Sequence, residues 1–258
     1  MEWPTKKTLA LLLGGAALLT GFYLTLDKLK DTLEAQLADR LTQAVDQLRD
    51  RNIEVRLGGI YALEGLARTS ESEYWPIMEI LTTFVRERAS VTKNQPPKEP
   101  PLRLAPDIQA ALDVIGRRRH TYKDGESQRL DLRGTDLRRA NLAGAKLAGA
   151  ILSEVRLEEA NLAGIGLEEA ILRAAHLERS NLVDAKMQGA FLLNTSLNGA
   201  RLRNANLQGA FLSGTRLDGA DLLGADLTDA NGLIWEQLKM ARKDNKTRLP
   251  AYLSLRAR

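Results

Sequence analysis

Side chains that commonly bind metals or act as reactive groups are scarce in this chain. It contains no cysteine, which excludes thiolate chemistry, and only two histidines, His120 and His176, which lie far apart in the sequence. A metal site needs several ligands held together. We therefore interpret His176, which falls at an outward position of a repeat, as a solvated surface histidine, and we predict no metal site.

Paired carboxylates and one short glycine motif are the remaining candidates for chemistry. The carboxylates are Glu158 with Glu159 and Glu168 with Glu169, but we expect them on neighbouring convex faces that form no cleft. Gly164 and Gly166 give a G-x-G motif that lies inside the repeat. A phosphate-binding loop would precede a helix, and this motif does not. The sequence predicts no catalytic residue and no cofactor, and it does not favour an enzyme.

These residues belong to a long internal repeat of five residues. From Leu132 to Leu227 a large apolar residue recurs at every fifth position, twenty times in succession, and all of them are leucine except Met187. The residue two positions earlier is small and mostly alanine. A period of five fits neither a helix nor a flat strand. A fixed internal period instead indicates a solenoid.

The pentapeptide has a direct geometric interpretation. In an extended segment the residues at i−2 and i point the same way and the residue at i−1 points the opposite way, so alanine and leucine face inward. The last two residues turn the chain, and ten of the twenty residues at i+2 are glycine, which tolerates positive φ. A slower period of twenty residues relates similar outward residues, so four pentapeptides form one coil. About five coils would stand roughly 24 Å tall.

The pattern from Leu130 to Ala230 resembles the pentapeptide-repeat family. The resemblance implies a right-handed quadrilateral β-helix with leucine or phenylalanine at the centre and alanine at i−2. Two positions depart from it: Ile165 is large where alanine is expected, with Gly166 beside it to relieve the crowding, and Gly232 replaces the next leucine. The segment from Val55 to Ala89 resembles one that precedes the repeats in bacterial membrane-anchored members.

The sequence predicts a mainly β solenoid preceded by a transmembrane helix and a small α-helical region, with short α-helical caps. Residues 28–92 are expected to be helical, because leucine and valine form one apolar stripe over 28–51 and two further helices follow near 53–68 and 74–90. The other predicted segments are a proline-rich linker at 93–106, a capping helix and lead-in at 107–129, the β-helix at 130–230, and a capping helix with a basic, solvated tail at 231–258.

The first 27 residues are expected to form a membrane anchor. Thr8 to Leu26 contains no charge over nineteen residues, long enough to cross a bilayer. A cleaved signal peptide would have a shorter apolar region and a cleavage site, and a buried core helix is rarely apolar on every face, so we favour an uncleaved anchor. We expect a single-pass membrane protein whose bulk domain lies in the cytoplasm. This orientation rests on analogy with the family, because the charges on the two sides of the span barely discriminate between the two orientations.

One face of that predicted anchor carries small residues. They are Ala10, Gly14, Ala17 and Gly21. Such a face lets two membrane helices approach closely, although glycine is enriched in membrane helices generally. The same pattern therefore allows either a packing face or no role, and a homo-oligomer is one expected form of the protein.

One outward column of the solenoid is apolar, whereas the other three are mainly polar. It consists of Ile151, Ile171, Phe191 and Phe211, with Leu193 beside them. An exposed apolar patch of a few hundred Å² often marks a contact surface. This column either binds an unidentified protein or a second copy, stabilises only itself through stacked side chains, or is covered by the chain's own helices.

The expected function is a membrane-anchored, non-enzymatic scaffold whose β-helix presents flat faces to a protein partner. The alternative is a DNA mimic that regulates a type II topoisomerase, the role that the resemblance implies through the quinolone-resistance members. That role relies on an acidic rod, whereas residues 131–230 carry 11 Lys and Arg against 13 Asp and Glu, a net charge of −2. We therefore favour the scaffold and expect no nucleic-acid partner.

Overall fold

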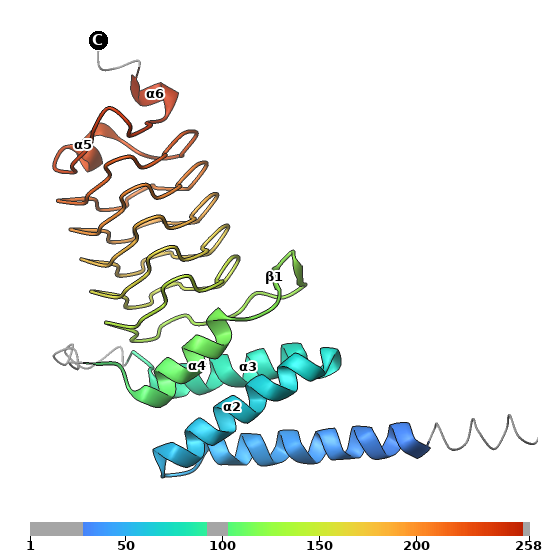
Figure 1. Cartoon of the computed structure of the whole chain (residues 1–258). Helices are drawn as coiled ribbons and strands as arrows, with labels where there is room; N and C mark the ends of the chain where they lie inside the picture. Colours follow the sequence, from blue (N-terminus) through green and yellow to red (C-terminus); the bar gives the residue numbers. More distant parts are fainter. Residues whose placement is uncertain (1–27, 92–102, 255–258) are drawn as a thin grey trace, which may run out of the picture.

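The computed structural model describes residues 28–91 and 103–254. These residues form a stack of coils with a group of helices at one end (Figure 1). The helices are a helix over 28–48, α2 (Ile53–Thr69), α3 (Glu71–Arg88) and α4 (Pro106–Gly116). A small sheet of β1 (Thr121–Tyr122) and β2 (Gly125–Glu126) follows, and α5 (Trp235–Leu238) and α6 (Ala251–Ser254) lie at the far end.

The helices begin at capping residues and pack through fully buried aliphatic side chains. The side chain of Asn52 accepts a hydrogen bond from the Glu54 N–H before α2, and Ser70 does the same for Glu73 before α3, which satisfies donors that a helix leaves free. Buried side chains include Leu63 of α2, Leu81 of α3 and Leu112 of α4, all with 0% exposure. These three helices therefore share one core.

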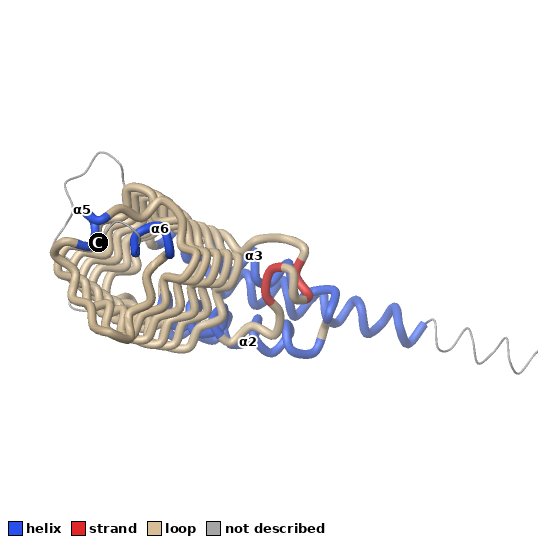
Figure 2. Tube along the Cα trace, turned by 90° about the horizontal axis from the view of Figure 1, so that it is seen from above, coloured by secondary structure: helices blue, strands red, loops and turns tan. Residues whose placement is uncertain are grey.

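The solenoid repeats every twenty residues. Parallel bridges join each outward residue to the one twenty positions later in four separate columns, as in Ile151 with Ile171, His176 with Ser196, Asn161 with Asn181 and Lys146 with Gly166. Figure 2 shows the coils in register above one another. The β-helix solenoid predicted from the five-residue period is confirmed, and each coil has four sides.

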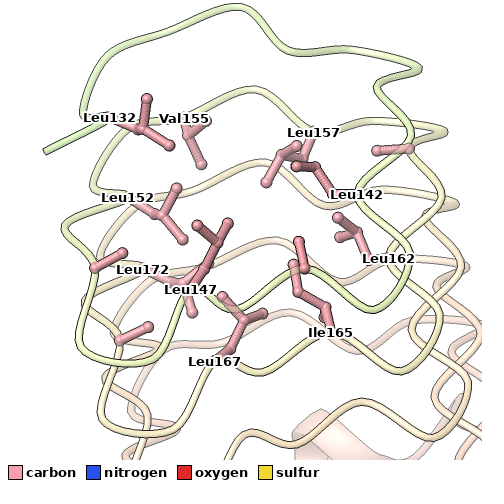
Figure 3. Packing of buried hydrophobic residues seen from close by; sticks show 14 of the residues in the cluster. Leu132, Leu142, Leu147, Leu152, Val155, Leu157, Leu162, Ile165, Leu167 and Leu172 are labelled. Atoms are coloured by element: carbon pink, nitrogen blue, oxygen red, sulfur yellow. The ribbon is translucent and has the colours of Figure 1, made fainter. Parts of the chain in front are cut away.

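The inside of the solenoid is filled by its own repeat residues. All twenty central residues from Leu132 to Leu227 are at most 2% exposed, and Figure 3 shows Leu132, Leu152 and Leu172 of successive coils stacked in the interior. All twenty residues at i+2 have positive φ, ten of them glycine and ten not. The side-chain directions of the whole solenoid are thus fixed by the repeat register.

The helices close the N-terminal end of the solenoid. Gly116 O at the end of α4 accepts a hydrogen bond from Lys146 N–H at 3.0 Å, and the Gln109 side-chain amide bonds both the N–H and the C=O of Asn141 at 3.0 and 2.8 Å. Ala89 O accepts from Asp136 N–H at 2.6 Å. These bonds pair backbone groups that would otherwise form an open sheet edge.

The C-terminal segment continues the solenoid. The sequence assigns it to a capping helix and a solvated tail, but α5 spans only Trp235–Leu238. Residues beyond it form two more parallel bridges, Arg242 with Asp221 and Arg248 with Asp226, and Leu253 is 4% exposed. The basic charges of this segment therefore line a final partial coil, at least as far as residue 253.

Acid should loosen this final coil. Burial alone would raise the pKa of Asp221, but hydrogen bonds from Arg203 and the Leu223 N–H, together with the charges of Arg203 and Arg242, lower the pKa below the ordinary 3.8. A carboxylate with a lowered folded pKa stabilises the fold above its unfolded pKa, and that stabilisation is lost as the pH falls through the folded pKa. We expect amide exchange of Leu222 N–H, which bonds Arg242 O, to accelerate below about pH 3.8.

The measurement is hydrogen exchange followed by NMR or mass spectrometry, corrected for the intrinsic pH dependence of exchange. Leu172 N–H in a central coil, which donates to Phe191 O, is the internal reference. At neutral pH the Asp221→Asn variant should reproduce the loosening at Leu222. Equal acid acceleration at Leu172 and Leu222 would show that the final coil is no less stable than the middle.

The structure changes the predicted location of the protein. Within residues 28–91 and 103–254, no helix is both long and apolar enough to cross a membrane. Charged side chains recur along these helices, as in α3 with Glu73, Glu79 and Arg86, and their apolar faces pack on one another. This finding overturns the predicted single-pass membrane location with a cytoplasmic bulk. The predicted anchor at Thr8 to Leu26 lies outside the described residues, as does its small-residue face of Ala10, Gly14, Ala17 and Gly21.

Candidate functional site

Ile151, Ile171, Phe191 and Phe211 stack one above another on one side of the solenoid, and we call them the apolar ladder. Parallel bridges join each rung to the next. The rings of Phe191 and Phe211 are parallel, with centroids 4.9 Å apart and an interplanar angle of 1°. The first three rungs are half-buried, and Phe211 is 38% exposed. The ladder thus offers a narrow apolar strip to solvent.

Polar residues border the apolar ladder. Asp131 is bridged below Ile151 and Asn231 is bridged above Phe211. Leu193 is half-buried and extends the apolar strip sideways. The N-terminal helices lie at the end of the coil stack and leave the upper coils uncovered (Figure 1). The structure therefore brings the five predicted interaction residues onto one face.

A second group lies on the next face of the solenoid. The sequence singles out His176 and Glu158 separately but does not predict that they meet or that Glu178 joins them. Glu158, His176 and Glu178 each offer a ligand atom, and these atoms all lie within 4.8 Å of one another. We call them the carboxylate–histidine cluster. His176 Nδ1 is 3.4 Å from Glu178 Oε1. The twenty-residue register could have indicated this cluster, because it places Glu158 one coil before Glu178 and His176 two residues before Glu178.

Burial and charge shift the pKa values of this cluster. Burial, with the nearby negative charge of Glu178, raises the pKa of Glu158. The hydrogen bond to Glu178 raises the pKa of His176. Burial alone would raise the pKa of Glu178, but the hydrogen bond with His176 helps to lower it. His176 is accessible to solvent, as the sequence predicts, with its side chain 45% exposed, but it also lies within hydrogen-bond distance of Glu178.

The other histidine is elsewhere. His120 lies edge-on to the Tyr74 ring, with centroids 5.2 Å apart, and its Nε2 is 3.5 Å from Glu71 Oε1. His120 therefore lies where α3 contacts the segment that leads into the small sheet. Nearby, a surface hollow of about 530 Å³ has walls from both that sheet and the coils, and Lys123, Lys146 and Lys186 are among the residues that line it. The structure therefore does not combine the two histidines.

Comparison with known proteins agrees with the geometry of the solenoid. The family model described as pentapeptide repeats matches residues 128–164, 160–199 and 195–231. The chain belongs to the pentapeptide-repeat family. These matches cover the coils that carry both the apolar ladder and the carboxylate–histidine cluster.

Several solved pentapeptide-repeat structures are similar to this chain. One from the Arabidopsis thaliana thylakoid lumen is 30% identical, covering 45% of this chain and 77% of that protein with a TM-score of 0.33. Rfr23 from the cyanobacterium Cyanothece is 32% identical, and the match covers 46% of this chain and 87% of Rfr23 with a TM-score of 0.25. QnrB1, a plasmid-mediated fluoroquinolone resistance protein, is 18% identical, covering 49% and 69% with a TM-score of 0.22. The search of curated proteins found no match.

Proposed function

We propose that this pentapeptide-repeat protein is a non-enzymatic scaffold that binds a protein partner through the apolar ladder. The observation that carries the proposal is the stacked pair of Phe191 and Phe211, with Phe211 38% exposed on the outer surface. Exposed aromatic side chains bury much apolar area on contact and are enriched at interfaces. Pentapeptide-repeat families are generally structural or interaction proteins without enzymatic activity.

The architecture suits a rigid binding surface. Each rung is held by backbone hydrogen bonds on both sides, as in Phe191 N–H to Ala170 O at 2.9 Å and Leu192 N–H to Phe211 O at 2.8 Å. Because the ladder is ordered before binding, little conformational entropy is lost when a partner docks. The polar residues at both ends of the ladder would define the length of the bound segment. A second copy of the chain is one partner that fits this description.

Charge pairing disfavours the DNA-mimic alternative. A DNA mimic needs an uncompensated row of negative charges, but acidic side chains on this solenoid contact arginines. Glu159 Oε2 is 2.9 Å from Arg139 Nε, and Asp221 Oδ2 is 2.7 Å from Arg203 Nε. With a net charge of −2 over residues 131–230, the surface lacks the field that would imitate duplex DNA.

The proposal predicts that contacts with the partner concentrate on the apolar ladder. The full chain is expressed in its native host cells with a photo-crosslinking amino acid in place of Phe191. This variant should give a discrete crosslinked species. The same group in place of Asn181, which lies in a different column, is the matched control and should give none. The double variant Phe191→Ser/Phe211→Ser should lose association with the partner. The control double variant Asn161→Ser/Asn181→Ser should keep it.

Circular dichroism and the melting temperature control for folding, because both substitutions are outward. Equal crosslinking from Phe191 and Asn181, or association that persists in the double serine variant, would contradict the proposal. Crosslinked species of twice the chain mass would identify the partner as a second copy. A discrete species of another mass would identify a different protein.

A further inference from the structure

The carboxylate–histidine cluster leaves two buried carboxylate oxygens without donors. Glu158 Oε2 and Glu178 Oε2 are inaccessible to solvent and have no hydrogen-bond partner among residues 28–91 and 103–254. Two carboxylates on adjacent coils repel each other when both are charged. Buried charged oxygens need compensating positive charge. Here it comes from His176 and from the more distant Arg138 and Arg216, none of which donates a hydrogen bond to either Oε2 atom.

A third buried polar group at the cluster is poorly paired. Ser196, one coil after His176 in the same column, is 0% exposed. Its hydroxyl oxygen faces the Glu178 carboxylate but makes no hydrogen bond with good geometry to any residue that the structure describes. A fully buried hydroxyl without a partner is unusual in a folded protein. Ser196 therefore adds a third buried oxygen that faces the cluster with, at best, a poor hydrogen bond to Glu178.

We propose that Glu158, His176 and Glu178 bind a divalent transition-metal ion of the Zn²⁺ type on this face of the solenoid. One imidazole and two carboxylates form a ligand set that suits such ions. Mg²⁺ is less suitable because it prefers oxygen ligands and retains its waters. The ion would neutralise both carboxylates and leave a coordination position for water, the Ser196 hydroxyl or another ligand.

The distances allow the ion to be seated with small side-chain movements. Ligands of a tetrahedral Zn²⁺ ion lie about 2.0–2.2 Å from the metal and therefore roughly 3.3–3.6 Å from one another. His176 Nδ1 and Glu178 Oε1 are already 3.4 Å apart, and the cluster as a whole spans at most 4.8 Å. The backbone positions are fixed by the coils, so only side-chain rotations are needed.

Arginines near the cluster would compete with the ion. Arg216 Nη2 lies 3.9 Å from Glu178 Oε1, but the Arg216 side chain is 59% exposed and can turn into solvent. Arg138 is held by Asp136 at 2.6 Å. Arg156 is bridged to His176 in the same column and adds a further positive charge. We expect Arg216→Ala to strengthen metal binding, because it removes the most mobile competitor.

The test is calorimetric titration of the full chain, stripped with a chelator and then dialysed, with ZnCl₂. We expect one ion per chain and binding at least about tenfold weaker in His176→Gln and in Glu158→Gln. Glu168→Gln changes the corresponding repeat position in a different column and should bind Zn²⁺ as the original chain does. MgCl₂ in place of ZnCl₂ should give at least about tenfold weaker binding.

Histidine NMR gives a second readout that does not depend on variants at the cluster. The chain has two histidines, so a His120→Gln variant assigns both side-chain signals. Zn²⁺ should shift the His176 ring signals at one equivalent and leave those of His120 unchanged. No binding by the original chain, equal affinity in His176→Gln, or a shift confined to His120 would overturn the proposal.

Discussion

Replacing Leu172 with lysine should destabilise the solenoid by about 3–5 kcal/mol, because it places an ammonium group where no partner can reach it. Leu172 is 0% exposed in the centre of the coil stack. Its N–H and C=O are both used, in bonds with Phe191 O at 2.8 Å and Thr195 Oγ1 at 2.6 Å. The lysine side chain could not leave the interior without breaking these bonds. Chemical denaturation of the full chain measures the change.

The matched control is the adjacent outward residue. Arg173 is exposed, so Arg173→Ala should change the free energy of unfolding by no more than about 0.5 kcal/mol. Because neighbouring coils stabilise one another, damage at Leu172 should spread to the coils above and below. Equal thermal midpoints for Leu172→Lys and Arg173→Ala would refute the inward and outward assignment.

The solenoid could be predicted because its pattern is local and repeated. Once the period of five and the register of twenty are known, the direction of each side chain follows from its position in the pentapeptide. Leu172 and Phe191 obey this rule, with Leu172 fully buried and Phe191 on the outer face. The same register contains the carboxylate–histidine cluster, but whether Glu158 and Glu178 approach His176 depends on side-chain rotations that the pattern does not specify.

One local interpretation was only partly right. The sequence suggests that Gly166 relieves crowding around Ile165, and Ile165 is indeed buried, at 1% exposure. Gly166, however, occupies an outward position between Lys146 and Lys186. A Cβ at Gly166 would lie 3.0 Å from Glu168 Oε2, so the missing side chain makes room for Glu168 on the surface.

Contacts between distant segments could not be predicted. The final partial coil keeps only parts of the repeat, Ala241-Arg242-Lys243 and Thr247-Arg248-Leu249. Arg242 and Arg248 follow their bridged partners Asp221 and Asp226 by 21 and 22 residues instead of twenty, so the fixed period does not reach this coil. The buried pair of Arg118 and Glu126 has side chains 0% and 1% exposed, although charged residues in a sequence usually indicate a solvated surface. Such pairs become visible only when the helices are placed against the coils.

Asp107 at the start of α4 is the second residue whose loss should have a large effect. Asp107 Oδ2 is 2.8 Å from Arg56 Nε on α2 and 3.1 Å from Arg88 Nε on α3, and its side chain is 1% exposed. Asp107→Ala would leave the Arg56 guanidinium, 9% exposed, without its carboxylate. Removing one partner of a buried ion pair costs about 3–5 kcal/mol. Denaturant unfolding of the full chain should show this loss.

Asp46→Ala is the matched control, because Asp46 is exposed, and it should change the free energy of unfolding by less than about 0.5 kcal/mol. Replacing Asp107 by leucine and Arg56 by methionine together should recover much of the loss, since an apolar pair of similar size needs no charge compensation.

Since α4 holds the first coil through Gly116 and Gln109, amide exchange at Lys146 should also accelerate in Asp107→Ala. Unchanged exchange at Lys146 in a destabilised variant would show that the helices unfold without opening the solenoid, and equal stability of Asp107→Ala and Asp46→Ala would refute the role of the ion pair.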